Sequence, residues 1–267
     1  MDSAHTDDLR LPIWATLGEA FMALAEEWDS LLKAIALPAM IVASANVIAE
    51  GVIGGGTGGL GLWIIPLAVI PWAAHVIIAV ACHRYVLMGR EGLPSSWGLF
   101  WTKRETRFLG WTLAISMIAF LFVIPGVIAG GVAVFAFAAT FGEVLLGAGS
   151  VAFIPIVAGM ALALVPAIYV IARLSLLLPM TAVGQRPELK DAWALSRGNG
   201  WRLVAVMLLP SLFSISLTLP GLLFPEGGLY ARLSWSFLLT LVTVFGIGAL
   251  SKAYSWLSHH SEVESAV

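Results

Sequence analysis

The sequence has few charged residues. Of 267 residues, 11% are Asp, Glu, Lys or Arg and 60% are hydrophobic, whereas a soluble globular domain has roughly 25% charged residues. A soluble protein needs a polar surface to cover its core, and this chain has too few polar residues to form one. The composition excludes a soluble domain and indicates a protein whose surroundings are lipid.

Cysteine and clusters of basic residues are scarce as well. The single cysteine, Cys82, excludes an internal disulfide and any metal or cluster site built from cysteines alone. The net charge is -2, and no run of Lys or Arg follows one face or segment. Because nucleic-acid binding depends on such basic patches, we expect no nucleic-acid partner.

Six charge-free windows predict six transmembrane helices, since about 20 apolar residues cross the hydrocarbon core of a bilayer. The expected fold class is all-α: a polytopic transmembrane bundle of about six spans with an N-terminal amphipathic cytoplasmic helix. Residues 1–30 form the acidic N-terminal segment, 31–258 the six-span domain and 259–267 a disordered cytoplasmic tail. The windows cover residues 31–49, 60–87, a stretch after 107, 151–172, 203–225 and 233–251.

The third window is longer than one span requires. Residues 108–142 are 35 residues without a charge, or ~50 Å of helix, which exceeds a hydrocarbon core of about 30 Å. Pro125-Gly126 and Gly130-Gly131 offer places to break it. We expect one span followed by a short surface or re-entrant segment.

Basic residues predict the orientation. The connections between spans two and three and between spans four and five carry five Lys or Arg each. The other connections carry none except Arg232, so 13 of the 14 basic residues lie on one side. The positive-inside rule assigns that side to the cytoplasm. We therefore expect a multi-pass protein of the bacterial inner membrane with both termini cytoplasmic.

An amphipathic helix is predicted before the first span. Apolar residues recur there every three or four positions, and the opposite face is acidic, with Glu19, Glu26, Glu27 and Asp29. Two interpretations stay open: a solvated acidic face, or docking of that face on the basic loops. The apolar stripe comprises Trp14, Leu17, Phe21, Leu24, Trp28 and Leu31.

No catalytic or cofactor motif has its required context. The run from Gly56 to Gly61 has the letters of a dinucleotide fingerprint, but it lies in a predicted hairpin between spans rather than after a β-strand. The sequence contains no Gly-x-Ser-x-Gly elbow, His-Glu-x-x-His pair or phosphate-binding loop. We expect a protein that is not an enzyme and has no cofactor, catalytic residues or metal site.

Three residues form a candidate intramembrane polar site. His75 is the one ionisable side chain deep in a predicted span, where such groups are often functional. Our preferred interpretation is a neutral histidine that bonds to a neighbouring span. Asn46 and Glu50 stand one turn apart on the first span. They are suited either to cap the helix end, which we favour, or to bind a polar solute.

Prolines interrupt five of the six spans. Broken helices line the substrate site of some transporters, but proline also occurs in membrane helices without that role. Ser211, Ser214 and Thr218 form a hydroxyl stripe on the fifth span, for which interhelical packing is the preferred explanation. The candidate cytoplasmic-face cations are Arg84, Arg173, Arg197 and Arg202.

One stretch is distinctive. The segment from Arg173 to Pro179 ends a span. It is followed by a predicted short helix that starts at Pro187, with Leu189 and Trp193 facing inward, and that leads through the segment from Asp191 to Arg202 (DAWALSRGNGWR). Residues 83–111 repeat its Arg and Trp pattern loosely, which suggests an internal duplication. With the "LLKAIALPA" entry into the first span, this layout resembles the YciC-like proteins and the membrane domains of some glycerophosphodiesterases. The resemblance implies a fold and no activity.

Two functions fit this sequence. The preferred one is a scaffold or accessory subunit that packs against a membrane-protein partner or against a second copy in the bilayer. The alternative is a transporter or channel for a small, anionic solute, with Arg84 and Arg173 at its cytoplasmic mouth. A polar cavity at mid-depth near the proline breaks would favour the alternative. A filled interior would favour the subunit.

Overall fold

The computed structural model describes residues 10–26, 28–54, 64–93, 99–147, 153–223 and 228–266. In these residues the chain is helical without strands, and six helices are long and apolar enough to cross a membrane. The predicted all-α bundle with six spans is confirmed. The elements are α2 (Ile13–Glu26), α3 (Trp28–Gly54), α4 (Ile64–Met88), η1 (Gly89–Gly92), α5 (Lys103–Gly147), α6 (Phe153–Leu174), α7 (Leu177–Ala182), α8 (Leu189–Leu195), α9 (Gly200–Leu223) and α10 (Leu229–Ala266).

Helix α10 lies at the centre of the body. Consecutive helices pair as α3 with α4, α5 with α6, and α9 with α10, and α10 also contacts α2, α3 and α4. Two apolar clusters meet at α10. One contains Leu176, Leu203 and Ala249 from α6 to α10, and the other contains Ile35 and Ile78 from α3 and α4. The fold therefore closes around the last of the described helices.

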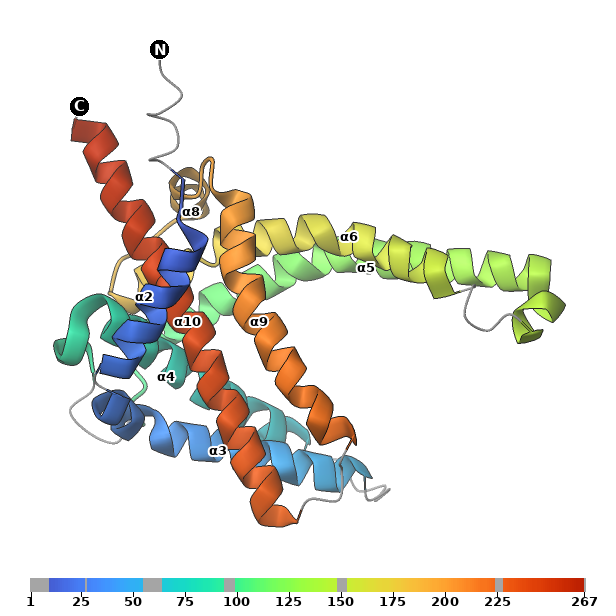
Figure 1. Ribbon diagram of the computed structural model, residues 1–267, viewed down its shortest axis with the longest axis horizontal. Helices are drawn as coiled ribbons and strands as arrows, with labels where there is room; N and C mark the ends of the chain where they lie inside the picture. Colours follow the sequence, from blue (N-terminus) through green and yellow to red (C-terminus); the bar gives the residue numbers. More distant parts are fainter. Residues whose placement is uncertain are drawn as a thin grey trace.

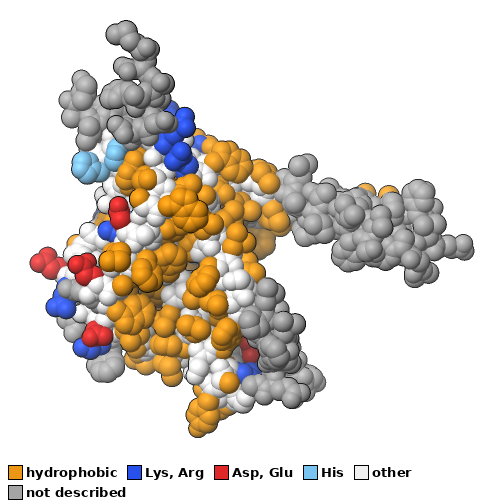
Figure 2. Space-filling view, in the orientation of Figure 1, with side chains coloured by type: hydrophobic (Ala, Val, Ile, Leu, Met, Phe, Trp, Pro, Cys, Tyr) orange, Lys and Arg blue, Asp and Glu red, His pale blue; other side chains and the backbone are white. Residues whose placement is uncertain are grey.

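The spans converge at one end and diverge at the other (Figure 1). At the converging end lie the connections after α4 and α6, which carry most of the basic residues, and we call it the basic end. From there α5 and α6 run side by side away from α3, α4, α9 and α10 as a projecting pair, the α5–α6 arm. On the face shown in Figure 2, apolar side chains cover most of the middle, as a lipid-facing surface requires.

Helix α5 corrects the expectation of a break. It runs without interruption from Lys103 to Gly147 with Pro125 inside it, or about 68 Å at 1.5 Å per residue. A proline removes one helical N–H, whereas a re-entrant turn in lipid leaves several backbone groups without partners. The continuous helix is the less costly of the two.

Helix α2 packs on the body with only part of the predicted apolar stripe. Its buried residues are Thr16, Leu17, Ala20 and Leu24, whereas Trp14 and Phe21 are 76% and 62% exposed. The reason is the close approach to α10, where a Cβ on Gly248 would lie 2.9 Å from the Leu24 side chain. Small residues suit that contact, and the aromatic residues are left on the outer side.

The described acidic residues at α2 do not form the contact, and Glu27 lies outside the described residues. Glu19, Glu26 and Asp29 are exposed and make no ion pair with another described residue. The segment is instead held by its backbone: Leu11 N–H donates to Asn199 Oδ1 at 2.8 Å, and Arg202 donates to the Leu11 carbonyl at 2.8 Å. Of the two interpretations, the described residues favour the solvated acidic face.

The end of the chain is also more ordered than predicted. Residues 259–267 were expected to form a disordered tail, but α10 continues to Ala266. The Trp256 and His260 rings stack with centroids 3.8 Å apart, which adds a contact one turn apart on the same helix. The sixth span is therefore the first part of a longer helix.

Candidate functional site

A cavity of about 550 Å³ lies between α4, α5, α9 and α10 near the base of the α5–α6 arm. Its volume falls within the range of about 300–1,000 Å³ that is usual for small-molecule sites. Most of its lining is apolar, and none of the described lining residues is Asp, Glu, Lys or Arg. The polar lining residues are two histidines and five hydroxyl residues: His75, His83, Thr112, Ser175, Ser211, Ser214 and Thr243.

Four of these hydroxyls donate to the backbone of their own segment. Thr112 bonds the Phe108 carbonyl at 2.9 Å, and Ser175 bonds the Ala172 carbonyl at 2.8 Å. Ser211 bonds the Met207 carbonyl at 2.8 Å, and Thr243 bonds the Leu239 carbonyl at 3.1 Å. Such bonds to the preceding turn are the common arrangement for Ser and Thr inside helices. Each hydroxyl oxygen keeps lone pairs that can accept a further bond.

His75 lines the same cavity, but its bond differs from the prediction. Its Nδ1 lies 2.8 Å from the carbonyl oxygen of Pro71, one turn earlier on α4, and not against a neighbouring span. Because a carbonyl oxygen only accepts, Nδ1 must carry the hydrogen of this bond. The neutral ring then leaves Nε2 as an acceptor.

His83, which the sequence analysis did not single out, is buried in the structure. It is 1% exposed, with Nδ1 2.7 Å from the hydroxyl oxygen of Ser251 on α10. Its ring lies 5.8 Å from the Phe108 ring of α5. The side chain therefore joins three helices at the bottom of the cavity, eight residues from His75 along α4.

Two of the three residues of the hydroxyl stripe on α9 line the cavity. Ser211 and Ser214 both lie in its lining, near Pro210, and Thr218 does not. Ser211 and Thr218 bond to carbonyls of their own helix. Packing between helices, the preferred interpretation of the stripe, stays a prediction.

Arg173 has a structural position that excludes it from the cavity mouth. The residue is 7% exposed, its Nε donates to Ser196 Oγ at 2.7 Å, and its Nη2 donates to the Trp193 carbonyl at 2.5 Å. Its Cζ lies 3.6 Å from the centroid of the Trp193 ring. The arginine therefore holds α8 against the end of α6.

Arg84 acts in a similar way at the end of α4. Its Nε donates to the Gly92 carbonyl at 2.7 Å, and its Nη1 donates to the Ala182 carbonyl at 3.4 Å. Both arginines end a span and bond to the short helix that follows it or lies beside it. Neither lines the cavity between α4, α5, α9 and α10, so neither supports its use by an anion.

The remaining predicted residues are apart from the cavity. Arg197 is exposed, and Arg202 holds the Leu11 carbonyl. Asn46 and Glu50 do not cap α3. Asn46 donates to Ser236 Oγ at 3.1 Å, and Glu50 pairs with Arg232 at 2.5 Å, so both connect α3 to α10 at the end away from the basic loops. His75 and the Asn46–Glu50 pair therefore do not form one site.

The distinctive 191–202 stretch is partly as predicted. A short helix forms, and Gly198 adopts a positive φ of 75° in the turn that follows it. Leu189 and Trp193, which were expected inward, are each 44% exposed, while Ala192 is fully buried. Ala192 therefore faces the body, and the exposed Trp193 ring contacts Arg173.

Glu105 is a buried residue that the sequence analysis missed. It is 6% exposed at the start of α5, where its carboxylate accepts bonds from the backbone N–H and the hydroxyl of Thr102. The order Thr102-x-x-Glu105 is the sequence signature of a helix capping box. These bonds hold Glu105 at the basic end, where it lines a pocket together with Arg84 and Arg104.

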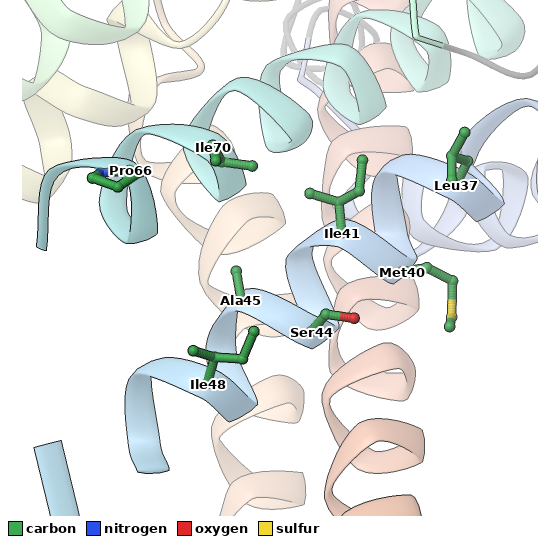
Figure 3. A pocket seen from close by; sticks show the side chains of 8 residues that line it. All are labelled: Leu37, Met40, Ile41, Ser44, Ala45, Ile48, Pro66 and Ile70. Carbon is green, nitrogen blue, oxygen red and sulfur yellow. The ribbon is translucent and has the colours of Figure 1, made fainter. Parts of the chain in front are cut away.

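A second hollow lies on the outside of α3 and α4 (Figure 3). Ile41, Ala45 and Ile48 of α3 lie below Pro66 and Ile70 of α4 in this view. Its volume is about 420 Å³, and Ser44 supplies its one described polar side chain. Such an apolar groove is suited to contact lipid chains.

The described residues do not change the predictions about metal and dinucleotide sites. Among the residues that the structure describes, no group of three or more His, Cys, Asp or Glu side chains is suited to hold a metal ion. The run from Gly56 to Gly61 lies outside the described residues. The absence of a cofactor stays a prediction.

Comparisons with family models, curated proteins and solved structures found no match to this chain. The resemblance to YciC-like and glycerophosphodiesterase membrane domains therefore stays a prediction. The cavity and the helix contacts are the basis for any function.

Proposed function

We propose that this six-span membrane protein binds a small molecule in the cavity between α4, α5, α9 and α10, as a non-enzymatic transporter or channel does. The observation that carries the proposal is the cavity itself, about 550 Å³ in volume and lined at mid-depth by His75 and hydroxyl groups near Pro210. An accessory subunit would fill this space with side chains, because empty volume between helices costs packing energy.

The divergence of the spans supports this proposal. Near the cavity, the α5–α6 arm leaves the other spans and runs away from them (Figure 1). Packing between the arm and the other spans is therefore confined to the region of the cavity, where a change in that packing would alter access to it.

The test is to fill the cavity and look for a bound molecule. Ser211→Phe adds a ring at a residue that lines the cavity, whereas Leu212→Phe adds one at the next residue, which is not part of the lining. Each protein is purified in mild detergent, and bound small molecules are identified by native mass spectrometry. Thermal unfolding and gel filtration confirm that both variants fold.

We expect a discrete bound molecule in the wild type and in Leu212→Phe and its loss in Ser211→Phe. The same small-molecule content in all three folded proteins, or none in any of them, would contradict the proposal.

The second candidate is the scaffold or accessory subunit, and the α5–α6 arm favours it. The apolar part of α5 is ~50 Å long, whereas a core of about 30 Å accommodates ~40 Å of helix even at a tilt near 40°. The first part of α5, Lys103–Pro125, is also the least buried of the six candidate spans, at 11%. A second protein or a second copy against the arm would cover this excess length.

Cross-linking in native membranes tests the second candidate. In a Cys82→Ala background, Leu121→Cys lies on the arm and Leu212→Cys on α9, and both positions are well exposed. A partner on the arm should give a cross-linked band of defined size from Leu121→Cys and not from Leu212→Cys. Equal, diffuse products from both positions would exclude a specific arm partner.

A further inference from the structure

The hydrogen bonds around the cavity restrict the chemistry of its ligand. This inference rests on the proposed solute site and concerns which solute it accepts. Four lining hydroxyls, those of Thr112, Ser175, Ser211 and Thr243, already donate their single hydrogen to a backbone carbonyl. To donate to a ligand instead, each would have to give up a bond inside a low-dielectric site, where an unmade bond is costly.

His75 adds a fifth acceptor. Its Nδ1 hydrogen is used by the Pro71 carbonyl, so in the neutral ring Nε2 presents a lone pair. The groups come from five segments: α4 for His75, α5 for Thr112, α9 for Ser211, α10 for Thr243 and the turn after α6 for Ser175. The cavity is therefore lined from several sides by groups that accept hydrogen bonds.

Charge gives a second restriction. No acid or base is among the described residues that line the cavity, and burying an ion without a partner of opposite charge is costly. A carboxylate would find no base among these described lining residues, and an ammonium would find acceptors but no acid, so either ion would be buried without a counter-charge. A neutral molecule avoids both penalties.

We propose that the cavity accepts an uncharged amphiphile with an apolar body and a hydrogen-bond donor, such as the hydroxyl of a long-chain alcohol or of a neutral glyceride. The apolar lining contacts the body, and the acceptor groups of His75 and the hydroxyl residues receive the donor. This differs from the anionic solute suggested by the sequence, whose supporting arginines bind backbone carbonyls elsewhere.

The experiment compares ligands that differ only at the polar end. A diazirine-labelled dodecanol is cross-linked to the purified full-length protein in detergent, and the labelled peptides of α4, α9 and α10 are quantified. Competitors are dodecanol, dodecyl methyl ether, dodecanoate and dodecylammonium, each at the same mole fraction of the micelle so that partitioning is equal. The ether keeps the acceptor oxygen of the alcohol and lacks its donor hydrogen.

Dodecanol is expected to compete roughly 3–10-fold better than the ether, which corresponds to one net hydrogen bond. The combined variant Thr112→Val, Ser211→Ala and Thr243→Val keeps the shape of the cavity and removes three acceptors. In that variant the two competitors should become equal. His75→Gln, which keeps an acceptor, should retain more of the preference than His75→Leu.

Each of the other outcomes contradicts one stated part of the proposal. Equal competition by alcohol and ether in the wild type overturns the donor rule and leaves the cavity as a binding site. Stronger competition by dodecanoate or dodecylammonium overturns the neutrality of the ligand. Labelling that is the same in wild type and Ser211→Phe, with no cavity peptide enriched, overturns the proposed solute site as well.

Discussion

At the scale of single residues, two arginines at span ends, the buried Arg173 and the half-buried Arg84, hold the basic end together. Arg173 combines two hydrogen bonds with a contact over the Trp193 ring, and Arg84 bonds two backbone carbonyls from separate segments. A guanidinium is suited to this because its donors are fixed in a plane that also stacks on aromatic rings. A lysine has one ammonium group and no such plane.

We predict that Arg173→Ala lowers the free energy of unfolding by about 2–3 kcal/mol, since hydrogen bonds to a charged group are lost and Ser196 and Trp193 lose their partner. Arg173→Lys should lose part of this. The measurement is unfolding in mixed micelles. Arg197→Ala, at an exposed arginine of the same segment, serves as the control and should change little. An equal loss in both would show that the segment responds to charge alone.

A second prediction concerns Gly92 in η1. A Cβ there would lie 2.4 Å from the Arg84 carbonyl oxygen, which is main chain and cannot rotate away. Gly92→Ala should therefore destabilise the fold by about 1–3 kcal/mol. Gly110→Ala in α5 meets no atom within 4 Å and should be neutral or stabilising, because alanine restricts the unfolded chain. The measurement is thermal unfolding of both variants. Equal changes in stability would contradict the steric conflict between a side chain at residue 92 and the Arg84 carbonyl.

At the scale of elements, α2 is held by its small, buried face. Gly248→Val on α10 should push Leu24 away and speed hydrogen exchange of residues 13–26, because the two side chains have no room. The double reversal Glu19→Lys and Glu26→Lys should leave exchange unchanged, since both acids are exposed. Faster exchange after the charge reversal, with none after Gly248→Val, would assign the docking to charge.

Helices α2 and α5 show what the sequence could predict about elements. Apolar windows located the spans, because length and lack of charge are read directly from the residues. Apolar periodicity did not give the buried face of α2, since Trp14 and Phe21 are as well placed against lipid as Leu17 and Leu24 are against α10. Pro125 did not end α5, because in lipid the helix is the better way to satisfy the backbone.

At the scale of the whole molecule, the arrangement predicts a topology that can be tested. Reporter fusions within residues 85–106 or 180–200, or after Val267, should read cytoplasmic, and fusions near Gly56 or Gly147 periplasmic. The reason is the concentration of basic residues at one end of the bundle. A periplasmic C-terminus would mean an odd number of spans and would contradict the six-span arrangement.

The cavity is the part of the molecule that could not be predicted from the sequence. Its lining comes from five segments that are far apart along the chain, and only the Ser211 and Ser214 stripe left a local pattern. His75 was found because an ionisable residue inside a span is conspicuous, but its bond to Pro71 depends on rotamer and helix geometry. Pattern analysis gives the residue types on each helix, and only the packing of the helices shows which of them meet.

The central position of α10 has a consequence for how the protein is made. Helix α10 is the last described helix to leave the ribosome, yet α2, α3, α4 and α9 all rest against it. The α3–α4 and α5–α6 pairs must therefore enter the bilayer and wait there as separate hairpins, with Val42, Ile78 and Cys82 facing lipid until Val244 arrives. During that interval the nascent chain has no completed body, and a stalled or shortened chain would present the quality-control machinery with loose hairpins rather than a slightly smaller protein.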